Sequence, residues 1–550
     1  MRTVLFNRRR GDEPATSARR YSIRRAGGGS SLMARTATGR RRRPRGDDRI
    51  SALPDDLLLV VLRRLDIRTA VGTTALSRRW ACLRGELPIL DLSVHAMLPP
   101  RYHRWIQLHG VVGKSGFQYD MRQVSRELLP NIRRYEHRAM RALTRSVQSF
   151  LDAPTAFRRR RISRLRLEFF VTQSTECMNR LIAEAIDACG VDDLQVVAKP
   201  IFWRRGAVHT HTFASHGLCK EPSASRLQSL KLGGCMLPPL YEYSALTRLV
   251  LQDIPESTPV ATYQGVFTSC QQLQVLHLIS CRCSAGGILV DAPMSKIKEL
   301  VVDKCRFRQL RLRALPNLES LASLGHMVFL ESASFPCLRK FNLTSRLGLR
   351  TQGFREYVKQ RLKIDHESLL ENMPEISSLI VRISGPYRWI VPSRGSPSTV
   401  LLPNLRRLLV ADVPSSWDVS WPRLLLETAP SLEVLHIHIA TCTQDGPSDE
   451  IRWKPTTLLR HRHLEEFVMV GYEGTERQIY LVKFVMGVCT ALRQVSIFRN
   501  GHARNKGHWD WELVTQQHLW TDEEKKHTLK HIMDGVSPLS PAAPVKLVFG

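Results

Sequence analysis

Histidines and cysteines that lie close together are the residues of this sequence whose types could bind a metal. Cys281 and Cys283 are separated by one residue and could supply two zinc ligands, but no second pair at a matching spacing completes a site. Three histidine pairs have the same spacing: His209/His211, His436/His438 and His461/His463. The sequence places no cysteine or carboxylate partner beside them, so we interpret all of these residues as core, turn or surface side chains. We predict no metal site and no cofactor.

Sequence motifs for catalysis are also missing. Residues 110–115 contain the glycines, lysine and serine of a phosphate-binding loop, but Leu108 stands where the first glycine of such a loop is required. Neither a His-Glu-x-x-His pattern nor a Gly-x-Ser-x-Gly elbow occurs. We therefore predict that the protein is not an enzyme, unless folding gathers residues that sequence spacing hides.

Positive charge is concentrated at the N-terminus. The 550-residue chain has a formal net charge of +31, and residues 1–46 combine dense arginine with few apolar residues, which predicts a disordered basic arm. Residues 40–45 could be a nuclear-localisation cluster, the arm could be an organelle transit peptide, or it could have no function, because a start at Met33 would remove most of it. Its only aromatic residues are Phe6 and Tyr21, so nucleic acid binding is not the expected main function.

Composition also bears on where the protein works. No stretch reaches the roughly 18 consecutive apolar residues that a membrane helix needs, so we expect no membrane partner. The 12 cysteines lack a regular framework spacing. This indicates reduced thiols and a location in the nucleus, the cytoplasm or both.

Residues 47–86 have the pattern of a small helical domain. Pro54 suits the first turn of a helix, and the acidic residues after it are favoured by the helix dipole. An apolar stripe comes next: Leu57, Leu58, Val61, Leu62 and Leu65. A second helix carries Leu76, Trp80 and Leu83 at positions i, i+4 and i+7. A segment of this length cannot bury all of its apolar surface by itself, and part of that surface should therefore contact a partner. The alternative is that the segment is an N-terminal cap on the remainder of the fold.

This segment resembles the F-box of plant F-box proteins. The resemblance is carried by Leu53-Pro54-Asp55-Asp56-Leu57-Leu58, by Leu65, and by Leu76-Ser77-Arg78-Arg79-Trp80. In that family the F-box is a short three-helix domain that docks onto a small SKP-family adaptor, which bridges to a cullin. The resemblance therefore implies an adaptor-binding role for six residues: Leu53, Pro54, Leu57, Leu65, Leu76 and Trp80.

A recurring apolar pattern at positions i, i+3 and i+5 decides the expected fold. The last two residues of each unit share one face of a short strand. The pattern occurs at Leu87/Leu90/Leu92, Ile162/Leu165/Leu167, Val191/Leu194/Val196, Leu227/Leu230/Leu232, Leu246/Leu249/Leu251, Leu273/Leu276/Leu278, Ile297/Leu300/Val302, Leu338/Phe341/Leu343, Ile376/Leu379/Val381, Leu405/Leu408/Val410, Leu432/Leu435/Ile437, Leu464/Phe467/Met469 and Leu492/Val495/Ile497, with Leu318/Leu321 incomplete. We therefore predict an α/β solenoid, an irregular leucine-rich-repeat array over residues 87–500, in preference to an ordinary parallel sheet with crossover helices.

Three repeats continue with a cysteine, and the return segments differ in length. Cys235, Cys281 and Cys305 come after their strands at the position where a leucine-rich repeat uses Asn or Cys to bond the turning backbone, so we expect them to be structural. Residues 178–189 form an amphipathic pattern typical of a return helix. Residues 98–160 fit the repeat poorly and are expected to be an insertion.

The C-terminal part carries a second resemblance. Within residues 455–500, the segments 463–467, 471–475, 481–484 and 492–495 are similar to the FBD segment that ends many plant F-box and leucine-rich-repeat proteins. Residues 501–550 should form a cap and tail, with a helix over 520–535 and a closing strand over 545–549.

Together these resemblances imply the substrate-recognition subunit of an SCF-type cullin-RING ubiquitin ligase, acting in ubiquitin-dependent protein degradation by linking a target protein to the adaptor. The alternative is an arginine-rich scaffold that binds nucleic acid or chromatin. We expect strand residues that alternate away from the core to line a concave face. Lys231, Arg248 and His277 are hypothesised to bind an acidic or phosphorylated target there, unless they are only solvated side chains. The sequence identifies neither the target nor its pathway, nor whether a small molecule assists recognition.

Overall fold

The computed structural model describes most of the chain from residue 50 onward. The described residues are 50, 52–65, 69, 79, 83, 89–114, 118–151, 162–172, 176–202, 210–284, 286–325, 328–330, 335–346, 375–384, 402–414, 426–440, 460–515, 520–534 and 545–550. The chain divides into two compact units, Met1–Pro54 and Asp55–Gly550. In the first unit the backbone N–H of Leu53 donates to the carbonyl of Ile50 at 3.2 Å. The predicted basic arm, residues 1–46, lies outside the described residues.

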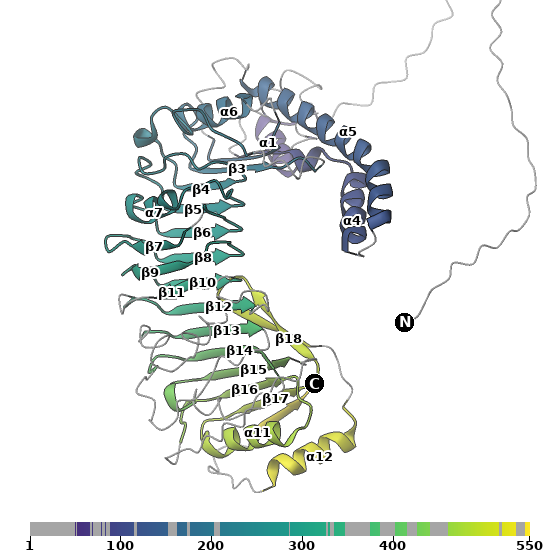
Figure 1. Cartoon of the computed structure of the whole chain (residues 1–550), viewed down its shortest axis with the longest axis vertical. Helices are drawn as coiled ribbons and strands as arrows, with labels where there is room; N and C mark the ends of the chain where they lie inside the picture. Colours follow the sequence, from purple (N-terminus) through teal and green to yellow (C-terminus); the bar gives the residue numbers. More distant parts are fainter. Residues whose placement is uncertain are drawn as a thin grey trace, which may run out of the picture. The chain divides into compact units, whose positions relative to one another are not determined.

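A parallel sheet of 15 strands organises the second unit (Figure 1). Its strands, in spatial order, are β1 (Ile89–Ser93), β2 (Arg164–Phe170), β3 (Asp193–Lys199), β4 (Ser229–Gly233), β5 (Arg248–Gln252), β6 (Val275–Ile279), β8 (Glu299–Asp303), β10 (Ser320–Leu324), β12 (Lys340–Arg346), β13 (Ser378–Ser384), β14 (Arg407–Pro414), β15 (Val434–Ala440), β16 (Glu466–Val470), β17 (Gln494–Phe498) and β20 (Lys546–Phe549). All of the predicted repeat strands are confirmed, including the incomplete one and the closing strand. The predicted domain boundaries stay predictions.

The register of the sheet places equivalent repeat residues beside one another. Leu230 pairs with Leu249, and Leu249 pairs with Leu276, so the apolar residues form continuous rows along the sheet. These rows are fully buried on one face, which we call the core face. The residues between them, such as Lys231, point to the opposite face, which we call the second face.

Cysteine thiols hold the turns that follow β6 and β8. The thiol of Cys281 donates to the carbonyl of Leu251 at 3.3 Å, and that of Cys305 donates to the carbonyl of Leu278 at 3.2 Å. Burial raises the pKa of the Cys235 thiol to about 12. The prediction that the repeat cysteines are structural is therefore confirmed for Cys281 and Cys305, and Cys235 is fully buried beside them in the core.

Return segments cover the core face with different elements. Among the described return segments, this purpose is served by helices α6 (Glu176–Asp187), α7 (Val260–Ser269) and α11 (Glu476–Val488). The predicted apolar face of α6 is confirmed, because its residues Met178, Leu181, Ile182, Ala185 and Ile186 are buried. Elsewhere the return chain forms a second, three-stranded sheet of β7 (Ile288–Asp291), β9 (Leu310–Ala314) and β11 (Val328–Leu330), and two single turns, η2 (Val94–Met97) and η4 (Pro222–Ala224).

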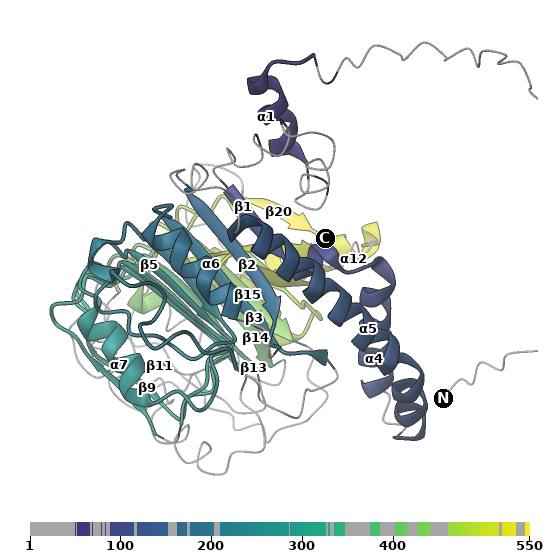
Figure 2. The same ribbon diagram turned by 90° about the horizontal axis from the view of Figure 1, so that it is seen from above.

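In its described part, the region without repeats forms helices α4 (Pro100–Lys114) and α5 (Gln118–Leu151), and α5 runs beside α6 at the start of the sheet (Figure 2). Ile132, Leu143 and Val147 on α5 are fully buried in the same core as the repeat leucines. Segment 110–114 is helical, so it does not form the glycine loop of a phosphate site. No described helix has both the length and the apolar character needed to cross a membrane.

The predicted C-terminal helix is α12 (Asp522–Met533). Thr521 and Glu524 form a reciprocal capping box at its start, which satisfies two otherwise unpaired N–H groups. The ring nitrogen of Trp520 donates to the carbonyl of Gly550 at 3.0 Å, and so joins this helix to the closing strand β20.

Gly234→Ala should weaken the repeats around β4 and β5. Gly234 has φ +63°, and an added Cβ would lie 1.9 Å from the carbonyl oxygen of Ala198. We expect a loss of about 2 kcal/mol or more, read as a lower thermal midpoint. Gly265→Ala is the matched control, because this residue lies within α7 with nothing within 4 Å of its Cβ position, and alanine favours the helix. Equal midpoints for the two variants would contradict the prediction.

Candidate functional site

The first candidate surface is the exposed apolar face of helix α1 (Asp55–Arg64). Its apolar stripe is divided by burial. Leu58 and Leu62 are fully buried, whereas Leu57, Val60 and Val61 are 51%, 44% and 39% exposed. The three exposed side chains form a contiguous apolar surface in water. Contiguous apolar surfaces of this kind mark protein interfaces, whereas single scattered apolar residues do not.

The six residues predicted to bind the adaptor are only partly described. Leu53 and Leu65 are half-buried, while Pro54 and Leu57 are exposed. Leu76 and Trp80 lie outside the described residues. Arg79, from the same sequence motif, contacts the carboxylate of Asp55 at 2.6 Å and so joins its segment to the first turn of α1.

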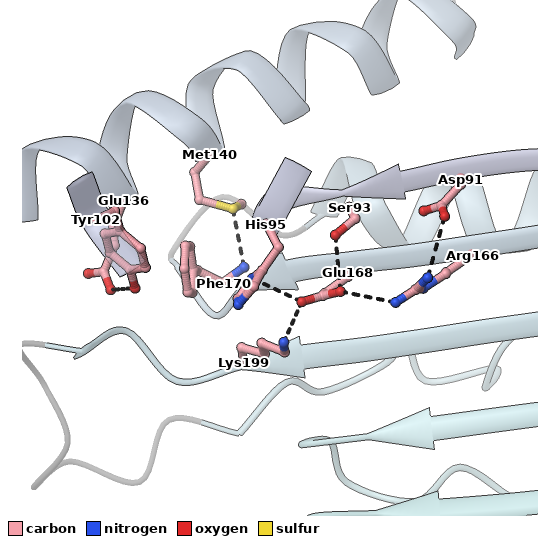
Figure 3. A network of polar contacts seen from close by, with 10 residues as sticks. All are labelled: Asp91, Ser93, His95, Tyr102, Glu136, Met140, Arg166, Glu168, Phe170 and Lys199. Carbon is pink, nitrogen blue, oxygen red and sulfur yellow. Dashed lines mark hydrogen bonds and ion pairs between the residues drawn. The ribbon is translucent and has the colours of Figure 1, made fainter. Parts of the chain in front are cut away.

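The second candidate surface is the second face of the sheet, where a polar network joins its first strands (Figure 3). Glu168 on β2 is 5% exposed and accepts a hydrogen bond from the hydroxyl of Ser93 at 3.0 Å. Its carboxylate lies 3.0 Å from Nδ1 of His95 and 3.7 Å from the guanidinium of Arg166. The ammonium of Lys199 on β3 also contacts it.

These partners determine the charge of the buried carboxylate. Burial would raise the pKa of Glu168, but hydrogen bonds from His95 and Lys199 and their positive charges outweigh burial and lower it to about 2. Glu168 is therefore ionised at neutral pH and is paired with its basic neighbours. The network fastens β1, β2 and β3 together, and it does not present a free catalytic acid.

Glu168→Gln should change the acid stability of the protein. The folded pKa lies below the usual 4.5, so the stabilisation from this carboxylate is complete above about pH 4.5 and is lost as the pH falls toward 2. Urea-unfolding midpoints measured from pH 6 to pH 3 should fall more steeply for the wild type than for the variant. Glu319→Gln, which removes a surface carboxylate 3.0 Å from Lys298, should keep the wild-type pH profile. Identical slopes for Glu168→Gln and wild type would contradict this assignment.

The predicted target-binding residues do not share one environment. Arg248 is exposed and Lys231 is half-buried on the second face. His277 is only 7% exposed, contrary to expectation, because its ring lies 2.6 Å from the carboxylate of Glu299 and meets the ring of His508 at 5.5 Å. Val301, which pairs with His277 in the sheet, is also buried.

A β-hairpin that the sequence did not predict places His508 against the ring of His277. Strands β18 (Gly501–Lys506) and β19 (Asp510–Thr515) pair antiparallel and fold back over the second face of β12 to β15 (Figure 1). A small apolar cluster forms between hairpin and sheet from Ile380, Leu409, Ala411, Ala503 and Trp511. The available sequence signal was Gly507, a left-handed turn residue that precedes alternating apolar residues at Trp509, Trp511 and Leu513.

Polar contacts fix the hairpin in place. The amide of Asn342 donates to the carbonyl of His508 at 2.8 Å, and Arg407 contacts Asp510 at 2.9 Å. The indole N–H of Trp511 donates to Nδ1 of His436 at 2.9 Å. The guanidinium of Arg407 also lies 4.5 Å from the centre of the indole ring, a cation–π distance.

Two of the three histidine pairs, His436/His438 and His461/His463, lie wholly within the described residues, and their members pack or hydrogen-bond within the fold. Neutral His461 accepts from the backbone N–H of Leu464 at 3.2 Å, and its other nitrogen lies 2.9 Å from the carbonyl of Ala429. His438 is buried, and burial lowers its pKa to about 3, so its ring is neutral. Within the described part of the chain, no three His, Cys, Asp or Glu side chains gather in a way that could hold a metal ion.

Trp511→Ala should loosen the hairpin from the sheet. The variant loses the indole hydrogen bond, the cation–π contact and most of the apolar cluster. A truncation of a buried aromatic residue typically costs about 3–5 kcal/mol. Limited proteolysis should then cut within residues 501–515 much faster than in wild type. Trp509→Ala, at the half-buried turn of the same hairpin, is the control, and equally fast cleavage of both variants would contradict the assigned role of Trp511.

Comparison with known proteins gives the class of protein that the chain resembles. It is 20% identical to an Arabidopsis thaliana protein named as an F-box/LRR-repeat protein, over 469 residues that cover 82% of this chain and 91% of the relative. Two Arabidopsis thaliana proteins named as F-box/FBD/LRR-repeat proteins match shorter segments, at 47% identity over 51 residues and 45% over 49. Each short match covers 9% of this chain and 11% of the relative. No protein-family model matches.

These similarities confirm the resemblance inferred from the sequence. The chain is similar over most of its length to a plant F-box/LRR-repeat protein, and over short segments to F-box/FBD/LRR-repeat proteins. The long parallel sheet built from leucine repeats agrees with the repeats in the relatives' names.

Proposed function

We propose that this protein is the substrate-recognition subunit of an SCF-type cullin-RING ubiquitin ligase. The observation that carries the proposal is the exposed apolar surface of α1, formed by Leu57, Val60 and Val61. It lies within the segment that resembles an F-box, and the relatives carry F-box in their names. In the proposal, the segment folds as a three-helix F-box and this surface docks onto a SKP-family adaptor, with a cullin bound beyond it.

The proposed mechanism is proximity and uses no reactive side chain of this protein. The leucine-repeat sheet holds a target protein while α1 holds the adaptor, so a separate catalytic subunit meets the target lysine at high effective concentration. Exposed Arg248 and half-buried Lys231 remain candidates for contacts to an acidic or phosphorylated target. This role is consistent with work in the nucleus, the cytoplasm or both, as the composition indicates.

A second candidate is a scaffold that binds nucleic acid or chromatin, favoured by the net charge of +31. Such a protein would bind polyanions with an affinity that falls steeply with salt, because each phosphate contact releases counterions. It would not require the apolar surface of α1. Adaptor binding therefore separates the two functions.

The adaptor interface predicts a clear binding defect. Leu57→Ala combined with Val61→Ala removes exposed apolar surface from α1 and leaves its buried side intact. We expect binding to a purified SKP-family adaptor to weaken about 30-fold or more, because central apolar contacts dominate such interfaces. The readout is adaptor affinity in a titration with the full chain.

Two controls make this experiment specific. Met294→Ala removes an 88% exposed apolar side chain elsewhere in the chain, and Arg64→Ala changes an exposed polar side chain of α1 itself. Both variants should bind the adaptor as wild type does. Undiminished adaptor binding by the Leu57/Val61 variant, together with undiminished binding after Trp80→Ala, would overturn the F-box assignment.

A further inference from the structure

Helix α5 presents a row of arginines to solvent. Arg134, Arg138, Arg141 and Arg145 are all exposed and are spaced i, i+4, i+7 and i+11, which places them in one line along the helix. This arginine row is about 17 Å long at 1.5 Å per residue. The opposite side of the helix packs into the core through Ile132, Ala139, Leu143 and Val147.

The arginine row has no counter-charge from the described part of the chain. None of its four side chains forms an ion pair or hydrogen bond with another described residue. The nearby carboxylate of Glu136 faces the core, where it accepts from the hydroxyl of Tyr102 at 2.9 Å and the backbone N–H of Phe202 at 3.0 Å. Like charges at i, i+3 and i, i+4 cost a few tenths of a kcal/mol per pair in a helix. An anionic partner would remove that cost.

The neighbouring sheet differs from the arginine row in its balance of charge. Arg164 on β2 contacts Asp193 at 2.6 Å, and Arg166 contacts Asp91 at 3.5 Å. Both arginines therefore form ion pairs with aspartates of the adjacent strands. The arginine row differs from these two strand arginines in having no such carboxylate partner among the described residues. A binding surface of this size suits a short acidic segment rather than a long polyanion.

Aromatic residues near the arginine row are not placed to stack on bases. The rings of Trp105 on α4 and Tyr135 on α5 pack against each other with centroids 5.4 Å apart, and both side chains are half-buried. Sites for single-stranded nucleic acid combine such cations with aromatic rings on which the bases stack. Guanidinium groups pair with carboxylates in two-point hydrogen-bonded geometry, which needs no ring.

We propose that the arginine row of α5 is a docking surface for an Asp- and Glu-rich segment of a partner protein. The partner's carboxylates pair with Arg134, Arg138, Arg141 and Arg145 along the exposed side of the helix. The identity of that partner as the ubiquitination target rests on the proposed function, whereas the docking surface itself does not. This surface lies outside the repeats and uses none of the residues predicted to bind the target.

The test is a titration of the full chain with a fluorescent 16-residue oligoglutamate peptide. A variant with Arg134, Arg138, Arg141 and Arg145 all replaced by glutamine keeps good helix propensity and loses four charges. We expect its affinity to fall tenfold or more, with a weaker salt dependence than wild type. A photo-crosslinking version of the peptide should attach within residues 126–148 of the wild-type chain.

The matched control has the same change in net charge at a different place. Four exposed arginines of the repeat region, Arg306, Arg308, Arg460 and Arg462, are replaced by glutamine. This variant should bind the peptide within twofold of wild type. Equal losses in the two variants, or crosslinks spread over the chain, would show nonspecific attraction to the net charge and would overturn the proposal.

Two further measurements distinguish the ligand of the arginine row from the proposed ligase function. Dependence on the arginine row for a 16-nucleotide RNA, with no such dependence for oligoglutamate, would assign the surface to nucleic acid and overturn the proposal. Adaptor affinity, measured on the same variants, should be unchanged. If the quadruple glutamine variant binds the peptide as wild type does while adaptor binding is intact, this inference alone is refuted. The effect of the Leu57/Val61 variant on adaptor binding tests only the ligase function.

Discussion

A constant register between parallel strands is the constraint on which the rest of this structure depends. Each repeat offers a few apolar residues on one face and cannot bury them alone, so it must stack on its neighbours. The pairing of Leu230 with Leu249 and of Leu249 with Leu276 keeps those residues in line, and a shift by one residue would turn them to the second face. The positions of Lys231, Arg248 and the other second-face residues are set by this same register.

The strands could be predicted because each has the same local spacing of apolar residues. Contacts between distant segments have no such local pattern and could not be predicted. Even the incomplete repeat at Leu318 and Leu321 forms its strand, with a fully buried serine, Ser323, at the position that should hold its third apolar residue. The hairpin was missed because residues 501–515 contain no repeat and their partners are far away. Asn342 and His508, for example, are 166 residues apart. His508 of this hairpin lies against the ring of His277, which is buried and not open to a target.

The candidate site was predictable in its chemistry and less so in its geometry. Helical spacing shows that Leu57 and Leu58 belong to one apolar stripe, but only the folded chain shows that Leu58 is covered by its own protein while Leu57 stays in water. The same limit applies to α5. A list of arginines in a sequence gives a net charge, whereas their alignment on one side of a helix, with Glu136 turned to the core, depends on which side the core takes.

The hairpin also has a consequence for how this protein is made. Stacked repeats can form one after another as the chain leaves the ribosome, since each needs only its neighbour. The second face of β13 and β14 is different, because Ile380 and Leu409 are covered by residues 503 and 511, which are synthesised more than 90 residues later than Leu409. A chain that ends early would leave these side chains exposed to chaperones and proteases. The cover over Ile380 and Leu409 is therefore made only after the repeats beneath it.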